Sequence, residues 1–100
     1  MCGIAGYFAY GPAAEPISEP TLVAIRDAML KRGPDGHGLW FDPSRRVGLA
    51  HRRLSIIDLS DGGFQPMVDE TERYALVFNG EIYNYRALRD ALIAEGVRFR

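Results

Sequence analysis

Residues 1–10 read MCGIAGYFAY, and this stretch sets how the chain begins to fold. The run is apolar and aromatic and is closed by Gly11 and Pro12, a pattern typical of a buried strand that ends in a turn. The strand is expected to begin at Cys2, the only cysteine in the chain. A lone cysteine is usually a small buried hydrophobe, which is one interpretation of Cys2.

The position of Cys2 directly after Met1 gives a second interpretation. Its side chain is small enough for the initiator methionine to be removed, after which one residue carries both a thiol and a free α-amine. A neutral amine can accept the thiol proton, so the nucleophile has its own base, as in hydrolases that use an N-terminal threonine. Gly3 leaves room for a substrate against the backbone. Cys2 is therefore a candidate nucleophile as well as a candidate core residue.

Length and composition limit the class of protein. One hundred residues fit one domain or part of one, and 47% hydrophobic with 25% charged residues argues against disorder. The formal net charge of −1 does not favour a nucleic-acid partner. One cysteine excludes an internal disulfide, and the N-terminus has neither the basic start of a signal peptide nor an unbroken apolar span. We expect a cytoplasmic protein without a membrane segment.

The pattern after the first strand alternates between helical and extended segments. A loop at residues 11–17 leads to Ser18, a plausible N-cap, and a helix is predicted to run to about Arg32 before Gly33-Pro34 stops it. The apolar stripe of that helix is expected to consist of Leu22, Ile25 and Met29.

Further along the chain, residues 37–41 and 47–51 predict a hairpin around the turn 42–44, and residues 73–78 predict another strand. A second helix should start at Asn84 and end before Gly96, with Leu88, Ala91 and Leu92 on its inner face. Residues 97–100 are expected to begin a last strand. This order predicts an α+β fold with a largely antiparallel sheet.

Asn79 and Gly80 come directly after the predicted strand 73–78 and allow two interpretations. Asn-Gly is a strong hairpin signal. An asparagine at a strand end can also present its amide N–H₂ to a developing oxyanion, with the Gly80 N–H beside it.

Arg52 and Arg53 precede an apolar run. A buried guanidinium needs a partner, either a substrate carboxylate gripped in bidentate fashion or a nearby acid such as Asp58 or Asp61. His37 and His51, with Cys2, do not fit a zinc pattern, and residues 61–63 lack the helix and lysine of a phosphate-binding loop. No metal site is expected.

Five segments occur in a recognisable order: residues 1–6, residues 32–36, residues 51–58, residues 65–67 and residues 79–84, with the sequences MCGIAG, RGPDG, HRRLSIID, QPM and NGEIYN. Together they resemble class II glutamine amidotransferases, and most of all the glutaminase domain of glutamine-hydrolysing asparagine synthetases. The resemblance spans nearly the whole chain.

The resemblance implies an N-terminal nucleophile hydrolase fold, a four-layer αββα sandwich of which residues 1–100 are the N-terminal part. It implies that Cys2 attacks the side-chain amide of glutamine and that ammonia passes to an ATP-dependent synthetase domain, which makes asparagine from aspartate. ATP and Mg²⁺ are expected for that domain, which is expected to lie outside residues 1–100. A homodimer is compatible with the resemblance.

The resemblance also implies the roles of the site residues. Asn79 and Gly80 would form the oxyanion hole, Arg53 would hold the glutamine α-carboxylate, and Glu81 would help to bind the α-amine. The pocket would be lined by Leu54, Ser55, Ile56 and Ile57. His37 and His51 acquire no catalytic role.

One departure from the family motivates alternatives. The Ser-Asp-x-Glu segment, whose aspartate binds the glutamine α-amine in the family, is absent from residues 1–100. The chain could then be a catalytically incomplete interaction module. It could also be the glutaminase half of a related ligase with a different acceptor, since the acceptor cannot be identified from this half.

Overall fold

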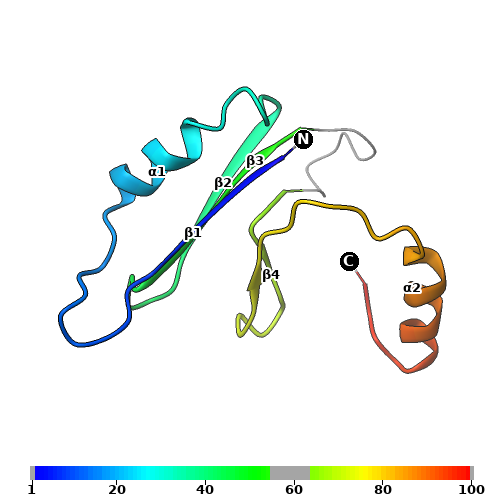
Figure 1. The fold of residues 1–100 in the computed structure, drawn as a ribbon. Helices are drawn as coiled ribbons and strands as arrows, with labels where there is room; N and C mark the ends of the chain where they lie inside the picture. Colours follow the sequence, from blue (N-terminus) through cyan, green and yellow to red (C-terminus); the bar gives the residue numbers. More distant parts are fainter. Residues whose placement is uncertain (1, 55–63, 100) are drawn as a thin grey trace.

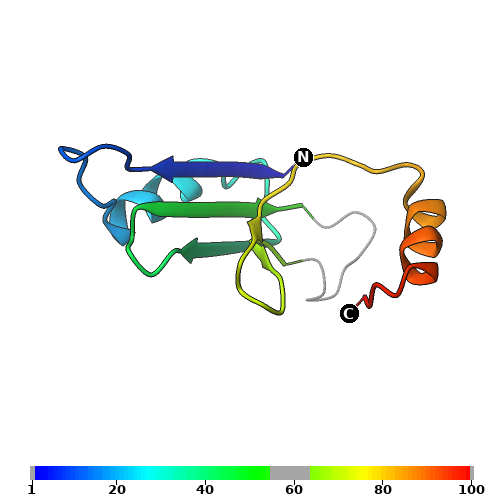
Figure 2. The same ribbon diagram turned by 90° about the horizontal axis from the view of Figure 1, so that it is seen from below.

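The computed structural model describes residues 2–54 and 64–99 of the chain. Its main sheet has three strands, β1 (Gly3–Phe8), β2 (Gly36–Phe41) and β3 (Val47–Arg53), in the order β1-β3-β2. Both pairings are antiparallel, and Figure 2 shows β3 between the other two strands. The predicted hairpin is confirmed. The first strand is present but begins at Gly3 rather than Cys2, and it is not buried on both faces: Ile4 is 45% and Phe8 67% exposed, because a helix covers only the other face.

Helix α1 (Glu19–Asp27) covers one face of this sheet (Figure 1). It begins where the sequence predicts, because the Ser18 side chain accepts a hydrogen bond from the Thr21 backbone N–H. It ends at Asp27 rather than near Arg32, so the predicted length is wrong. After Ala28, backbone N–H groups donate to the carbonyl three residues earlier instead of four, as in the bond from the Met29 N–H to the Arg26 carbonyl. The segment then continues as turns.

The buried stripe of α1 also differs from the prediction. Leu22 is fully buried and Met29 is half-buried, but Ile25 is 46% exposed. The stem of Arg26 is buried in its place, because residues four apart share the face that meets the sheet. The core is accordingly small: Leu22 packs with Ile17 and Ala50, and four partly buried side chains surround them, namely Ala5, Tyr7, Leu39 and Phe41.

A second, two-stranded antiparallel sheet pairs β4 (Met67–Val68) with β5 (Ala75–Leu76). Figure 1 places β4 on the side of the main sheet away from α1. The strand predicted at residues 73–78 is thus present in only two of its residues. Its shortness is explained by its partner, because β4 offers a pairing of two residues only.

Helix α2 (Tyr85–Ala94) has the predicted ends. Asn84 occupies the N-cap without a side-chain bond, and Gly96 has a φ of 95°. The Val97 N–H bonds to the Leu92 carbonyl and the Gly96 N–H to that of Ile93, which is the Schellman ending that a glycine permits.

The predicted inner face of α2 is not buried, since the helix buries no residue against the described part of the chain. It stands apart from the sheet in both views (Figures 1 and 2). The radius of gyration is 15.4 Å, larger than the ~13 Å typical of a compact domain of this length. Residues 97–99 are not in a strand, so that prediction is wrong for them; Arg100 lies outside the described residues.

The α+β class with antiparallel sheets is therefore observed. Over residues 2–54 and 64–99, no helix is long and apolar enough to cross a membrane.

Candidate functional site

Strand β3 sends alternate side chains to opposite faces of the sheet. Ala50 and Arg52 lie on the face covered by α1, where Ala50 joins the core and Arg52 reaches Asp27. His51 and Arg53 therefore lie on the opposite face. The two neighbouring arginines, which the sequence alone does not separate, thus belong to different environments.

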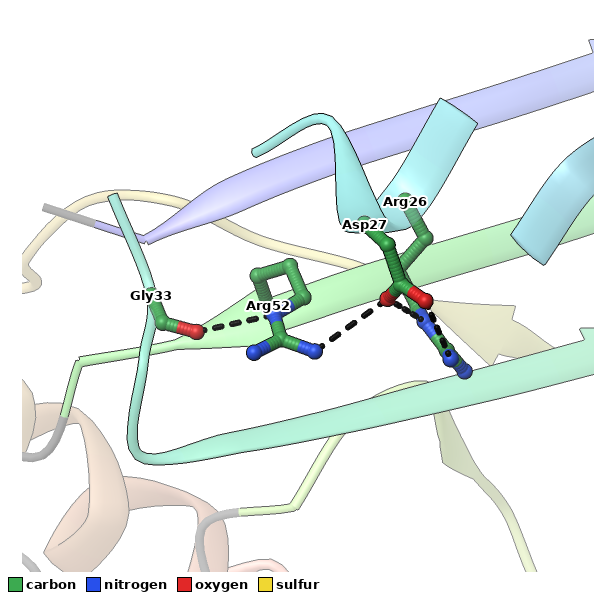
Figure 3. Close-up of polar contacts among 4 residues, drawn as sticks. All are labelled: Arg26, Asp27, Gly33 and Arg52. Carbon is green, nitrogen blue, oxygen red and sulfur yellow. Dashed lines mark hydrogen bonds and ion pairs between the residues drawn. The ribbon is translucent and has the colours of Figure 1, made fainter. Parts of the chain in front are cut away.

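Arg52 is bound to the protein itself (Figure 3). Its Nε donates to the Gly33 carbonyl at 2.9 Å, and its Nη1 lies 3.2 Å from Oδ1 of Asp27, which also accepts from Arg26 Nε at 2.9 Å. The hydrogen bond from Arg26, with the charges of Arg26 and Arg52, holds the pKa of Asp27 below its ordinary value of 3.8. Arg52 therefore ties the end of α1 and the loop after it to β3.

Asp27 is a partner that reasoning from the sequence missed. It lies 25 residues from Arg52, and no local pattern links two residues so far apart. The alternative partners Asp58 and Asp61 lie outside the described residues.

The segment RGPDG runs along the same end of β3. A Cβ on Gly33 would lie 2.4 Å from the Arg52 carbonyl carbon, so only glycine permits this approach. The Asp35 N–H then donates to the Arg53 carbonyl at 2.9 Å, and Pro34 forms a bridge with Arg53. This segment therefore fixes the backbone of Arg53.

Cys2 lies at the same end of the sheet. The Leu54 N–H points at Cys2 Sγ over 3.4 Å, and Sγ lies 3.8 Å from the Leu54 carbonyl oxygen. Because Gly3 pairs with Arg52, continuing the register by one residue sets Cys2 opposite Arg53 on the face away from α1. The thiol is half-buried, and an N–H directed at sulfur can stabilise negative charge there.

The Arg53 side chain is buried, at 8% exposure, and its guanidinium carbon lies 5.8 Å from the centre of the Phe64 ring. That distance is within the range of a cation–π contact. The predicted nucleophile and the predicted carboxylate-binding arginine are thus on the same face at the same end of the sheet.

Asn79, Gly80 and Glu81 are exposed and lie beyond the end of β5. A Cβ on Gly80 would lie 2.9 Å from the Phe78 ring, so Gly80 packs against that side chain. Within the described residues, no hydrogen bond joins Asn79 or Gly80 to Cys2. The structure therefore joins Cys2 to Leu54 and sets it opposite Arg53, while residues 79–81 have no hydrogen bond to Cys2 among the described residues. Ser55, Ile56 and Ile57 lie outside the described residues.

His51 lies beside this group and is 1% exposed. Burial lowers the pKa of His51 below its ordinary value of 6.5, and the positive charge of Arg53 lowers it further. A hydrogen bond with the Phe78 backbone acts in the opposite direction and raises this pKa. Among residues 2–54 and 64–99, no three His, Cys, Asp or Glu side chains are grouped to hold a metal ion.

Comparisons with known proteins identify the family of the chain. The pattern of the glutamine amidotransferase domain family matches residues 1–100. The chain is 45% identical over 100 residues to glutamine-hydrolyzing asparagine synthetase 1 of Bacillus subtilis (strain 168), covering 99% of this chain and 15% of that protein. It is 40% identical over 89 residues to glutamine-hydrolyzing asparagine synthetase B of Escherichia coli (strain K12), covering 89% of this chain and 15% of that protein.

A third relative has a different name. Amidase chry2 of Gibberella zeae is 39% identical over 105 residues, with 95% of this chain and 15% of that protein covered. The chain thus spans about 15% of the length of these three relatives. No solved structure matches the chain significantly.

Proposed function

The chain belongs to the glutamine amidotransferase domain family, and from this membership we propose that it hydrolyses the side-chain amide of glutamine through Cys2 and supplies the ammonia to an asparagine-forming reaction. The observation that carries the proposal is the cluster at the end of the main sheet. There the half-buried Cys2 thiol contacts Leu54 and, by the strand register, lies opposite the buried Arg53.

In the proposed reaction, Met1 has been removed and the free α-amine of Cys2 takes the thiol proton. Sγ attacks the amide carbon of glutamine, and the resulting oxyanion is stabilised by the Asn79 amide and the Gly80 N–H. The carbon–nitrogen bond breaks, the ammonium of Cys2 returns a proton to the leaving group, and ammonia departs. Water then hydrolyses the glutamyl thioester to glutamate and regenerates the thiol.

The other proposed roles concern binding of the substrate. Arg53 holds the glutamine α-carboxylate, for which a planar guanidinium is well suited. The backbone of Leu54, Ser55, Ile56 and Ile57 lines the pocket, and Glu81 helps to bind the α-amine.

The remaining proposals concern the whole protein. The chain forms part of a four-layer N-terminal nucleophile hydrolase fold. It is linked to a synthetase domain that binds ATP and Mg²⁺ and acts in the cytoplasm, where a free thiol persists. Relatives named asparagine synthetases support aspartate as the acceptor.

The test is a glutaminase assay on the full-length protein and on its Cys2→Ala variant. We expect the variant to lose glutamate formation by a factor on the order of 10⁴ or more, as when other nucleophiles are removed. It should still make asparagine from free ammonia, which serves as the control for folding. Glutamate formation by Cys2→Ala at the parental rate would refute the mechanism.

A second candidate keeps the glutaminase step and changes the acceptor. It is motivated by the similarity to amidase chry2. If the full-length protein hydrolyses glutamine in the presence of ATP and aspartate without forming asparagine, this second function is favoured.

A further inference from the structure

Phe78, the residue directly before Asn79, is held through its backbone by a distant side chain. Gln65 Oε1 accepts a hydrogen bond from the Phe78 N–H at 2.6 Å, across 13 residues of sequence. Gln65 is half-buried and Phe78 is 40% exposed, so the bond itself lies at the surface. None of the roles proposed above uses Gln65.

The backbone of Gln65 is in turn anchored on the main sheet. A Cβ on Gly38 of β2 would lie 1.9 Å from the Gln65 carbonyl oxygen and 3.2 Å from Pro66 Cδ. The chain at Gln65 and Pro66 therefore crosses directly over Gly38, and only glycine permits this. Gly38 pairs with His51 of β3, two residues before Arg53.

The buried ring of His51 lies on the same side. The His51 Nε2 has no hydrogen-bond partner among the described residues. A hydrogen bond with the Phe78 backbone raises the pKa of His51 and so opposes the lowering by burial. The Phe78 ring also lies against Gly80, on the far side of Asn79 in the sequence. The backbone before Asn79 is therefore connected to the sheet that carries Cys2 and Arg53 by way of Gln65 and Gly38.

We propose that Gln65 is a positioning residue for the oxyanion site. Its side-chain oxygen holds the Phe78 N–H and thereby sets where the Asn79 amide and the Gly80 N–H lie relative to the Cys2 end of the main sheet. This inference rests on the proposed function, because it assigns Gln65 a role only if Asn79 and Gly80 stabilise the oxyanion.

The test compares variants of the full-length protein in glutamine hydrolysis. Gln65→Leu keeps the size of the side chain but removes the acceptor, and Gln65→Glu keeps an acceptor oxygen. We expect Gln65→Leu to lower kcat by about 2- to 12-fold, the range that one net hydrogen bond supports, with KM for glutamine unchanged. Gln65→Glu should restore most of kcat, which a defect of packing alone would not explain.

Asp69 provides a matched control. Its Oδ1 accepts from the Tyr74 N–H at 2.9 Å, a bond of the same kind within the connection from β4 to β5. Asp69→Ala removes that bond and those that Oδ2 accepts from the Thr71 N–H and hydroxyl, none of which involves Asn79, and it is expected to leave kcat unchanged. An equal loss of kcat in Asp69→Ala and Gln65→Leu would overturn the proposal, because any weakening of this unit would then suffice.

A double-mutant cycle with Asn79→Ala gives the decisive result. If Gln65 acts through Asn79, Gln65→Leu should cost little further kcat in the Asn79→Ala background. Equal losses in both backgrounds, or no loss in either, would refute the role of Gln65. Retained glutamate formation by Cys2→Ala would instead refute the proposed function itself, so the two failures are distinguishable.

Discussion

The two faces of the main sheet are built from alternate residues of the same strands and have different contents. The face under α1 contains the small core and the Arg52–Asp27 ion pair, and Ala5 and Tyr7 of β1 pack there. The opposite face contains His51 and Arg53, with the Cys2 thiol at its end. On that face Phe8 is 67% exposed and Ile4 is also exposed.

The difference shows how one short strand separates stability from chemistry. Arg52 has its partners within the protein, at Gly33 and Asp27, and serves the fold. Arg53, the next residue, is on the side where the proposed substrate would bind. If this division is correct, changes to Cys2 and Arg53 should alter glutamine hydrolysis, whereas changes on the α1 face should alter stability.

The largest effect on the Cys2 face is expected from blocking its α-amine. Inserting one leucine between Met1 and Cys2 should prevent removal of Met1 and place the amine in a peptide bond. Loss of a general base typically costs about 10²- to 10⁴-fold in rate, and we expect glutamate formation to fall in that range. Intact mass verifies the retained residues, and full activity of a protein with Met1 in place would contradict the role of the amine.

The largest effect on the α1 face is expected from Leu22→Ala. Leu22 is fully buried at the centre of the core, and such truncations cost about 2–5 kcal/mol of unfolding free energy. Thermal unfolding of the full-length protein should shift down, whereas KM for glutamine in the remaining folded protein should not change. A raised KM with unchanged unfolding would mean that the two faces are not separate.

Matched lysine variants compare the faces at adjacent positions. Arg53→Lys keeps the charge but loses the planar fork, and KM for glutamine should rise by about 10- to 100-fold, since hydrogen bonds to charged groups contribute about 1.5–3 kcal/mol. Arg52→Lys should instead lower the unfolding midpoint, because one ammonium cannot reach both Gly33 and Asp27 as the guanidinium does. The reverse pattern would exchange the roles of the two arginines.

The smallest expected effect is a difference in pH dependence. Burial lowers the pKa of His51 below 6.5, so below that pH the unfolded chain binds more protons than the folded one. The contribution of neutral His51 to the free energy of unfolding is therefore complete above pH 6.5. It decreases as the pH falls from 6.5 toward the pKa of His51 in the folded protein. In His51→Gln, the midpoint of thermal unfolding should therefore change less with pH in this window than it does in the parent protein.

Asp27 provides the control on the other face. Its pKa lies below 3.8, so its contribution is present above pH 3.8 and is lost as the pH falls further through the folded pKa. Asp27→Asn should therefore change the pH profile only below about 3.8. A change near pH 6 in Asp27→Asn would contradict this assignment.

Local patterns were sufficient to predict some elements. The Ser18 cap, the hairpin of β2 and β3 and the glycine ending of α2 were predicted because each depends on neighbouring residues. The placement of Cys2 near Arg53 depends on the register of β1 and β3, which the sequence implied only through its resemblance to a family.

Features that depend on distant contacts were not predictable. The Arg52–Asp27 pair, the burial of Arg26 in place of Ile25 and the approach of Gln65 to Gly38 all need the tertiary arrangement. The predicted strand at residues 97–99 and the buried face of α2 also failed for this reason. Both require a surface to pack against, and the described residues do not provide one there.

The most direct test of the Cys2 face is covalent labelling of the full-length protein with a diazoketone analogue of glutamine, read out by intact and peptide mass. We predict a single adduct on Cys2 with Met1 absent, slowed by added glutamine and strongly reduced in Arg53→Ala but not in Leu22→Ala. Failure of Cys2 to react, or labelling that neither glutamine nor Arg53→Ala affects, would contradict a glutamine site at this end of the sheet.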